Sequence, residues 1–172
     1  LALLGAHCTL VARNEDSLQQ AIAQLDMSMH QQHRYLVADF SNNEQVKERI
    51  QQFAKEHTIH ILVNNTGGPP AGKISDAKDQ DFLSALHLHL INNHNITTAL
   101  LDGMREAGYG RIINVISTSV KIPLPNLGVS NTTRAAVAAW AKTLANEVAS
   151  AGITVNNVLP GATATVRLSS II

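Results

Sequence analysis

The chain has 172 residues, with 13 basic and 13 acidic side chains, so its formal net charge is zero. It contains no basic run, and its apolar stretches are short and broken by charge, which makes nucleic acid and membranes poor candidate partners. The first residues lack the basic start of a signal peptide, and Cys8 is the single cysteine, which excludes an internal disulfide. We therefore expect one cytoplasmic α/β domain over residues 1–172.

Strand-like and helix-like patterns alternate along the chain. Leu1–Gly5 is typical of the last turn of a helix, with Gly5 as its stop. Strands are expected at 7–12, 35–38, 59–63, 111–116 and 154–159, and helices at 15–25, 43–55, 79–104 and 130–150. Asn14 is placed to cap the first of these helices. This order predicts a Rossmann-like, doubly wound parallel sheet with helices on both faces.

The stretch Gly110–Gly161 predicts a strand, a crossover helix and a second strand. In such a unit the strands are parallel and their carboxyl ends share one edge of the sheet. Ligands of open α/β sheets bind at that edge. We therefore expect Ser117, Ser130 and the turn Pro160-Gly161 to converge there, although they lie far apart in the sequence.

This stretch resembles the second half of the short-chain dehydrogenase/reductase family, on the branch of the 3-oxoacyl-[acyl-carrier-protein] reductases. The family places a catalytic Ser at the end of this strand, a Tyr thirteen residues later and a Lys four residues further on. The matching positions here are Ser117, Ser130 and Arg134. A family Asn in the preceding long helix falls at His89. Of the four residues, only the Ser is retained.

The resemblance implies hydride transfer between NADP(H) and a carbonyl or alcohol, with Ser117 hydrogen-bonded to the substrate oxygen. Arg134 could still contact ribose and hold positive charge, but an Arg does not titrate. His89 has a suitable reference pKa, near 6.5, but it also fits a packed or interface histidine, because His87 and His94 share its helix. Ser130 fits catalysis or a helix cap, and Lys121 fits a solvated loop lysine. No metal site is expected.

Cofactor residues are expected at the ends of several strands. Arg13 suits a 2′-phosphate, which favours NADP over NAD, although an exposed Arg at a helix start would look the same. Asp39 matches the family position beside adenine, or begins a turn. Asn64-Asn65-Thr66-Gly67 resembles the family's Asn-Asn-Ala-Gly. The loop that supports nicotinamide corresponds to Pro160, Gly161, Thr163 and Thr165.

Compared with the family, the domain is incomplete at both termini. The family's first strand and its glycine-rich turn, which holds the pyrophosphate, have no counterpart, and neither does its last strand. The absent first strand belongs between the strands at 7–12 and 59–63, so we expect two open strand edges there. We interpret the sequence as part of a longer polypeptide, or else as a remnant.

Three functional hypotheses follow. The first is an NADP-dependent oxidoreductase acting on a small-molecule or acyl-carrier substrate of 3-oxoacyl type. The second is a catalytically weak dinucleotide-binding module, and the third is a remnant without a ligand. We expect a homodimer or homotetramer that pairs the helices 79–104 and 130–150, as family members often do.

Overall fold

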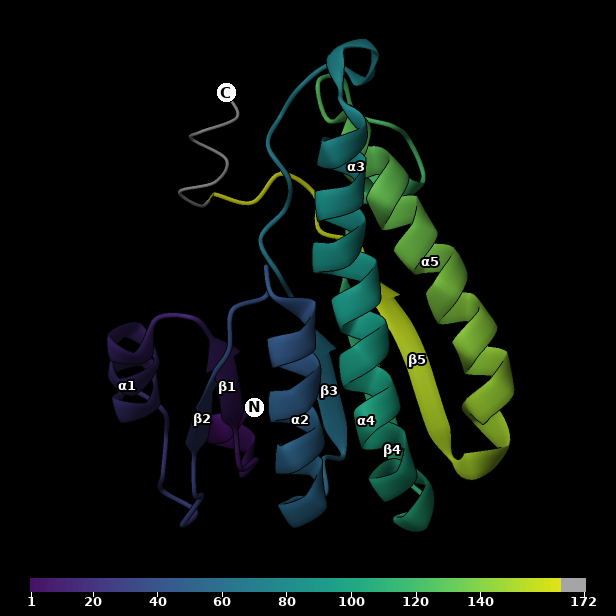
Figure 1. Cartoon of the computed structure of the whole chain (residues 1–172). Helices are drawn as coiled ribbons and strands as arrows, with labels where there is room; N and C mark the ends of the chain where they lie inside the picture. Colours follow the sequence, from purple (N-terminus) through teal and green to yellow (C-terminus); the bar gives the residue numbers. More distant parts are fainter. Residues whose placement is uncertain (165–172) are drawn as a thin grey trace.

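The computed structural model of the protein describes residues 1–164, in which strands and helices alternate as expected (Figure 1). The strands are β1 (Thr9–Ala12), β2 (Arg34–Val37), β3 (Ile61–Asn64), β4 (Gly110–Val115) and β5 (Ile153–Val158). The helices are α1 (Glu15–Ala23), α2 (Asn43–Glu56), α3 (Asp79–Leu86), α4 (Asn92–Glu106) and α5 (Gly128–Val148). The predicted stop at Gly5 is confirmed by its left-handed backbone, and Asn14 caps α1 through the amide of Ser17.

The described strands form two separate parallel sheets. One consists of β1 and β2, and the other has the order β3-β4-β5. The edges of β1 and β3 line a cavity of about 880 Å³ instead of pairing with each other. On β3, Ile61 and Val63 are 38% and 44% exposed. The open edges expected between these two strands are therefore present.

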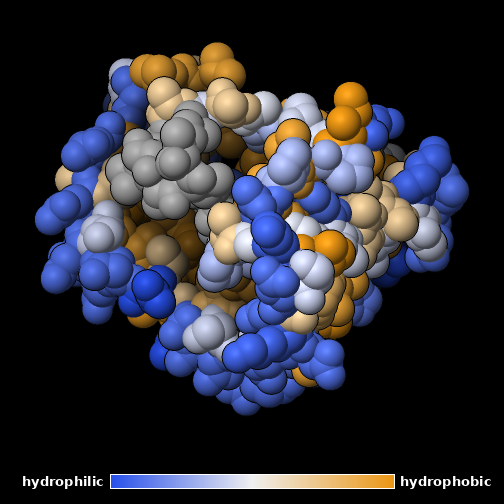
Figure 2. Space-filling model, turned by 90° about the horizontal axis from the view of Figure 1, so that it is seen from above, coloured by the Kyte–Doolittle hydropathy of each residue, from blue (hydrophilic) through white to orange (hydrophobic). Residues whose placement is uncertain are grey.

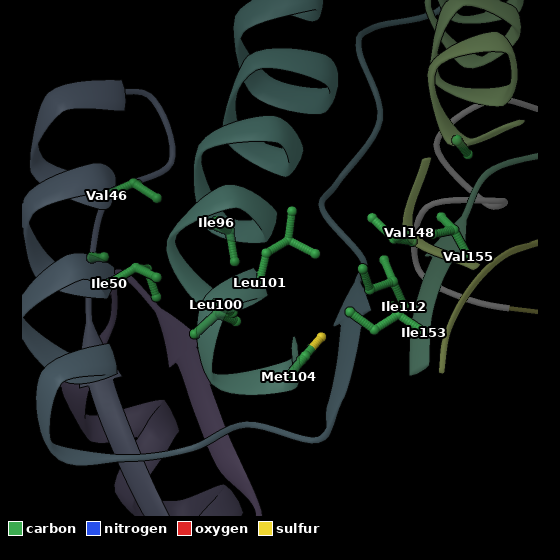
Figure 3. Close-up of a cluster of buried hydrophobic side chains, with 12 residues drawn as sticks. Val46, Ile50, Ile96, Leu100, Leu101, Met104, Ile112, Val148, Ile153 and Val155 are labelled. Atoms are coloured by element: carbon green, nitrogen blue, oxygen red, sulfur yellow. The ribbon is translucent and has the colours of Figure 1, made fainter. Parts of the chain in front are cut away.

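Helices α4 and α5 lie over one face of the three-stranded sheet and α2 packs beside α4, whereas α1 packs on the β1–β2 pair (Figure 1). Figure 3 shows the core beneath these helices, where Met104 of α4 and Ile112 of β4 are fully buried. Val46 and Ile50 of α2 approach the same core from the other side. The core therefore fixes the helices that carry candidate site residues relative to β3, β4 and β5.

The helix predicted over 79–104 contains an unexpected π turn. α3 and α4 are joined by a π-helical segment at His87–Ile91, so the helical path widens by one residue within a turn. The His87 carbonyl accepts the amide of Asn92 and also the side-chain amide of Asn43, at 3.0 Å. Side-chain periodicity does not reveal such an insertion. The π turn determines the direction in which His89, at the centre of the turn, projects.

None of the helices within residues 1–164 is long and apolar enough to cross a membrane.

Candidate active site

The carboxyl ends of β4 and β5 meet as the sequence predicts. The amide of Ile116 donates to the carbonyl of Val158 at 2.9 Å, and the amide of Thr118 donates to the carbonyl of Pro160 at 3.1 Å. Ser117, between these two amides, therefore lies beside the Pro160-Gly161 turn. We call this side of the molecule the carboxyl edge.

Figure 2, which views the molecule from above, shows a hollow with a hydrophobic floor and hydrophilic surroundings. The hollow lies between the part formed by α1, β1 and β2 and the rest of the molecule, and corresponds to the cavity of about 880 Å³. Phe40, Asn65 and Thr66 are among its lining residues. The Asn64–Gly67 segment therefore borders an open space at the end of β3.

The hydroxyl group of Ser117 can donate a hydrogen bond to a ligand. Its Oγ accepts a hydrogen bond from the amide of Ser119 at 3.1 Å, at the start of a short 3-10 turn. A hydroxyl has one hydrogen to donate and two lone pairs to accept. Because the amide occupies a lone pair, the hydroxyl hydrogen of this half-buried side chain remains available for an oxygen at the carboxyl edge.

The interpretation of Ser130 as a helix cap is wrong. α5 begins at Gly128 with Leu127 at the cap position, so Ser130 lies within the first turn and is 8% exposed. The loop after β3 packs tightly against the start of this helix. A Cβ at Gly128 would come within 2.5 Å of the Ile74 Cβ, so this approach requires glycine.

Arg134 lies four residues after Ser130, on the same face of α5. Its Nη1 donates to the carbonyl of Val115 at 3.0 Å, and its Nη2 donates to the carbonyl of Thr66 at 3.5 Å. The side chain is 8% exposed. Arg134 therefore places a buried positive charge at the carboxyl edge and joins the end of β4 to the loop after β3.

His89 has no exposed surface, and its Nδ1 lies 2.8 Å from the Oγ1 of Thr66. The structure thus brings together Thr66, His89 and Arg134, which the sequence placed in three separate segments. His87 and His94 are exposed, and His94 packs edge-on against Trp140. Within residues 1–164, no group of three His, Cys, Asp or Glu side chains could hold a metal ion.

A ladder of three asparagines crosses the sheet below these groups. Asn64 of β3 donates to Asn114 of β4 at 2.9 Å, and Asn114 donates to Asn157 of β5 at 3.1 Å. The three residues are in register, and Asn114 is fully buried. Sequence reasoning identified Asn64 but missed its partners. Their common signal is an Asn near the end of each apolar strand.

Arg13 and Asp39 follow β1 and β2, at the carboxyl edge of the smaller sheet. Hydrogen bonds from the amide and hydroxyl of Ser41 hold the pKa of Asp39 below its ordinary value of 3.8, and the charge of Arg13 acts in the same direction. The guanidinium of Arg13 is exposed and forms no ion pair or hydrogen bond with the residues described. It therefore remains able to receive an anionic ligand.

The remaining cofactor candidates have less defined surroundings. Asn65 is exposed, and a Cβ added at Gly67 would meet nothing within 4 Å, so the space beside this backbone is open. Thr163 donates to the carbonyl of Gly161 at 3.3 Å. Thr165 lies outside the described residues.

No tyrosine occupies the carboxyl edge in the part of the chain that the structure describes. Tyr35 is near the start of β2, where its hydroxyl donates to Glu15 at 2.9 Å. Tyr109 directly precedes β4 and lies under the guanidinium of Arg111. Lys121 is an exposed loop residue beyond Ser117. Both tyrosines are thus at the opposite ends of their strands.

Comparison with known proteins decides the family. A short chain dehydrogenase family model matches residues 1–171. The chain belongs to the short-chain dehydrogenase family. Its fold agrees with that of L-sorbose reductase from Gluconobacter frateurii, a structure complexed with NADPH and L-sorbose. That likeness has a TM-score of 0.89 and 32% identity, and covers 96% of this chain and 64% of that one.

Two relatives in the short-chain dehydrogenase family have names that differ on whether the protein is active. The 3-oxoacyl-[acyl-carrier-protein] reductase FabG of Haemophilus influenzae is 34% identical over 133 residues, covering 76% of this chain and 54% of that protein. Inactive hydroxysteroid dehydrogenase-like protein 1 of Homo sapiens is 27% identical over 162 residues, covering 93% and 49%. The chain therefore spans about half the length of these two relatives.

Proposed function

We propose that the protein is an NADP(H)-linked oxidoreductase that interconverts a carbonyl group and an alcohol on a 3-oxoacyl-type substrate. The observation that carries this proposal is the arrangement at the carboxyl edge. There Ser117 has a hydroxyl hydrogen to donate, and the buried guanidinium of Arg134 supplies a fixed positive charge nearby. Membership of the short-chain dehydrogenase family supports the same class of reaction.

The residues present suit a phosphorylated dinucleotide. When bound, NADPH supplies the hydride. Arg13 would hold the 2′-phosphate, because its exposed guanidinium has donors to spare, and Asp39, kept ionised, would face the adenine. The open space beside Gly67 admits a ligand close to the backbone. Pro160, Gly161 and Thr163 would support the nicotinamide end, with Thr165 following them in the chain.

At the substrate, Ser117 donates a hydrogen bond to the carbonyl oxygen, where negative charge develops as the carbon gains hydride. The oxygen must then gain a proton. We assign His89 as the proton source, in contact with the half-buried hydroxyl of Thr66. Ser130 and Arg134 are the remaining candidate catalytic residues. Arg134 stabilises negative charge at this edge without itself titrating.

An apolar cavity supports an acyl substrate. It has a volume of about 620 Å³, and one of its lining residues is Ser119, two residues after Ser117 in the sequence. Ile74, Val120 and Leu124 are among its lining residues, and Pro123 and Pro125 restrict the loop that forms one wall. A hydrocarbon chain attached to a 3-oxo group, free or on an acyl carrier, would bury apolar surface there.

A second candidate is a dinucleotide-binding protein without turnover. It is kept because Ser130 and Arg134 stand where the sequence comparison with the family expects Tyr and Lys, and because one relative is named as inactive. Titrating the protein with NADPH and then adding 3-oxoacyl thioesters separates the candidates. Binding followed by NADPH oxidation supports the oxidoreductase, and binding alone supports the second candidate. Absence of binding contradicts both.

Replacing Arg13 by alanine is expected to weaken NADPH binding about 10- to 100-fold and to leave NADH binding unchanged. The expected loss corresponds to about 1.5–3 kcal/mol for hydrogen bonds to a charged group. Arg34→Ala is the matched control, because Arg34 is also exposed but lies at the start of β2, at the end of the strand away from the carboxyl edge. Equal losses for NADPH and NADH in Arg13→Ala would contradict the assigned 2′-phosphate contact.

We also propose that the protein acts as a homodimer or homotetramer in the cytoplasm. Of the helices expected to pair, α3 and the π turn contact α5 within the chain. Leu83 and Ile91, on α3 and the π turn, are 51% and 38% exposed and provide apolar surface for a second copy.

A further inference from the structure

Thr66 occupies a junction between two other site residues. Its hydroxyl oxygen lies 2.8 Å from Nδ1 of His89, and its carbonyl accepts from Nη2 of Arg134 at 3.5 Å. These contacts come from the π turn on one side and from α5 on the other. One residue in the loop after β3 therefore touches both candidate groups.

The contact with His89 has a chemical consequence. A neutral imidazole carries its proton on one of its two ring nitrogens. A Thr hydroxyl can accept a hydrogen bond from a protonated Nδ1 or donate one to an unprotonated Nδ1, so this contact restrains the position of the ring in either tautomer. Because His89 is fully buried, its ring is positioned by neighbouring groups inside the protein.

Arg134 fixes the other half of this arrangement. Its guanidinium holds the carbonyls of Val115 and Thr66, so the backbone of Thr66 is tied to the end of β4. A side chain on a backbone restrained in this way is presented in a defined direction, which sets the distance from its hydroxyl to the imidazole ring.

We infer that Thr66 is a positioning residue for His89: its hydroxyl fixes the orientation of the imidazole through Nδ1, and Arg134 holds Thr66 in place. Thr66, His89 and Arg134 thus form one connected unit. The inference relies on the proposed function only for the catalytic role of His89, because the contacts themselves are independent of turnover.

The test uses the ring-nitrogen chemical shifts of ¹⁵N-labelled protein, with the His89 signals assigned from their loss in His89→Asn. Thr66→Val keeps the β-branched shape and the carbonyl but removes the hydroxyl, and it should shift the Nδ1 resonance of His89, because that nitrogen loses this hydrogen-bond partner. Thr66→Ser is the matched control and should retain the wild-type shifts. Unchanged His89 shifts in Thr66→Val would overturn the inference. Absence of turnover together with the expected shifts would count against the proposed function alone.

If Thr66→Val does not fold, the denaturation midpoints of Thr66→Ala, His89→Asn and the double variant provide the second test. A connected unit predicts that the double variant loses clearly less stability than the sum of the two single losses. Additive losses would overturn the inference.

Discussion

Replacing Ser117 by alanine should lower kcat for carbonyl reduction about 100-fold or more, without changing the affinity for NADPH. The variant removes the hydroxyl that donates to the substrate oxygen, and loss of one such donor costs about 100- to 1,000-fold in other enzymes. The effect belongs to the chemical step because negative charge on that oxygen develops only in the transition state. Stopped-flow measurement of NADPH oxidation gives kcat, and a fluorescence titration gives the affinity.

Two variants test whether this loss is specific. Thr118→Ala alters the neighbouring exposed residue, whose structural contact to Pro160 comes from the backbone, and it should retain wild-type turnover. Ser117→Thr keeps a hydroxyl and should recover part of the activity. Wild-type turnover in Ser117→Ala would show that the oxygen is stabilised elsewhere.

The second large effect concerns stability. Asn114→Leu should lower the free energy of unfolding by about 2–4 kcal/mol, because it removes both hydrogen bonds of the asparagine ladder and leaves polar groups of the buried Asn64 and the half-buried Asn157 without these bonds. Leucine has as many side-chain heavy atoms as asparagine, so the substitution leaves no cavity. Urea denaturation followed by circular dichroism measures the change.

Asn156→Leu is the matched control for the ladder. Asn156 is next to Asn157 on β5 but is exposed, and its side chain contacts only Thr154 among the hydrogen-bonded partners described, at 3.3 Å. Its effect on unfolding should stay within about 0.5 kcal/mol. Comparable losses in the two variants would mean that the ladder contributes no more than any polar residue on this sheet.

The sequence was sufficient for the fold because the strands and helices carry strong local signals. Apolar runs identified five strands, and 3–4 spacing identified the helices to within a few residues of their ends. The edge shared by Ser117 and Pro160 followed from the handedness and direction of a crossover unit. These features depend on periodicity and topology, which can be read along one chain.

Other features depend on contacts between distant segments and were missed. α5 begins at Gly128, whose backbone packs closely against Ile74, and not at Ser130, the residue that the sequence offered as a cap. The π turn that orients His89 has no periodic signature, and its contact with Thr66 joins residues 23 positions apart. The asparagine ladder requires the register of three strands. Each depends on tertiary geometry that local propensity does not encode.

The central claim is that hydride passes to a carbonyl group held at the carboxyl edge. The most direct test is to incubate the protein with NADPH carrying deuterium at the transferable position and with a 3-oxoacyl thioester, and to examine the product by mass spectrometry. We predict one deuterium on the carbinol carbon, formed by the wild-type protein and strongly reduced in Ser117→Ala. NADPH binding without any deuterated alcohol would contradict the account and leave the protein as a dinucleotide-binding member of its family.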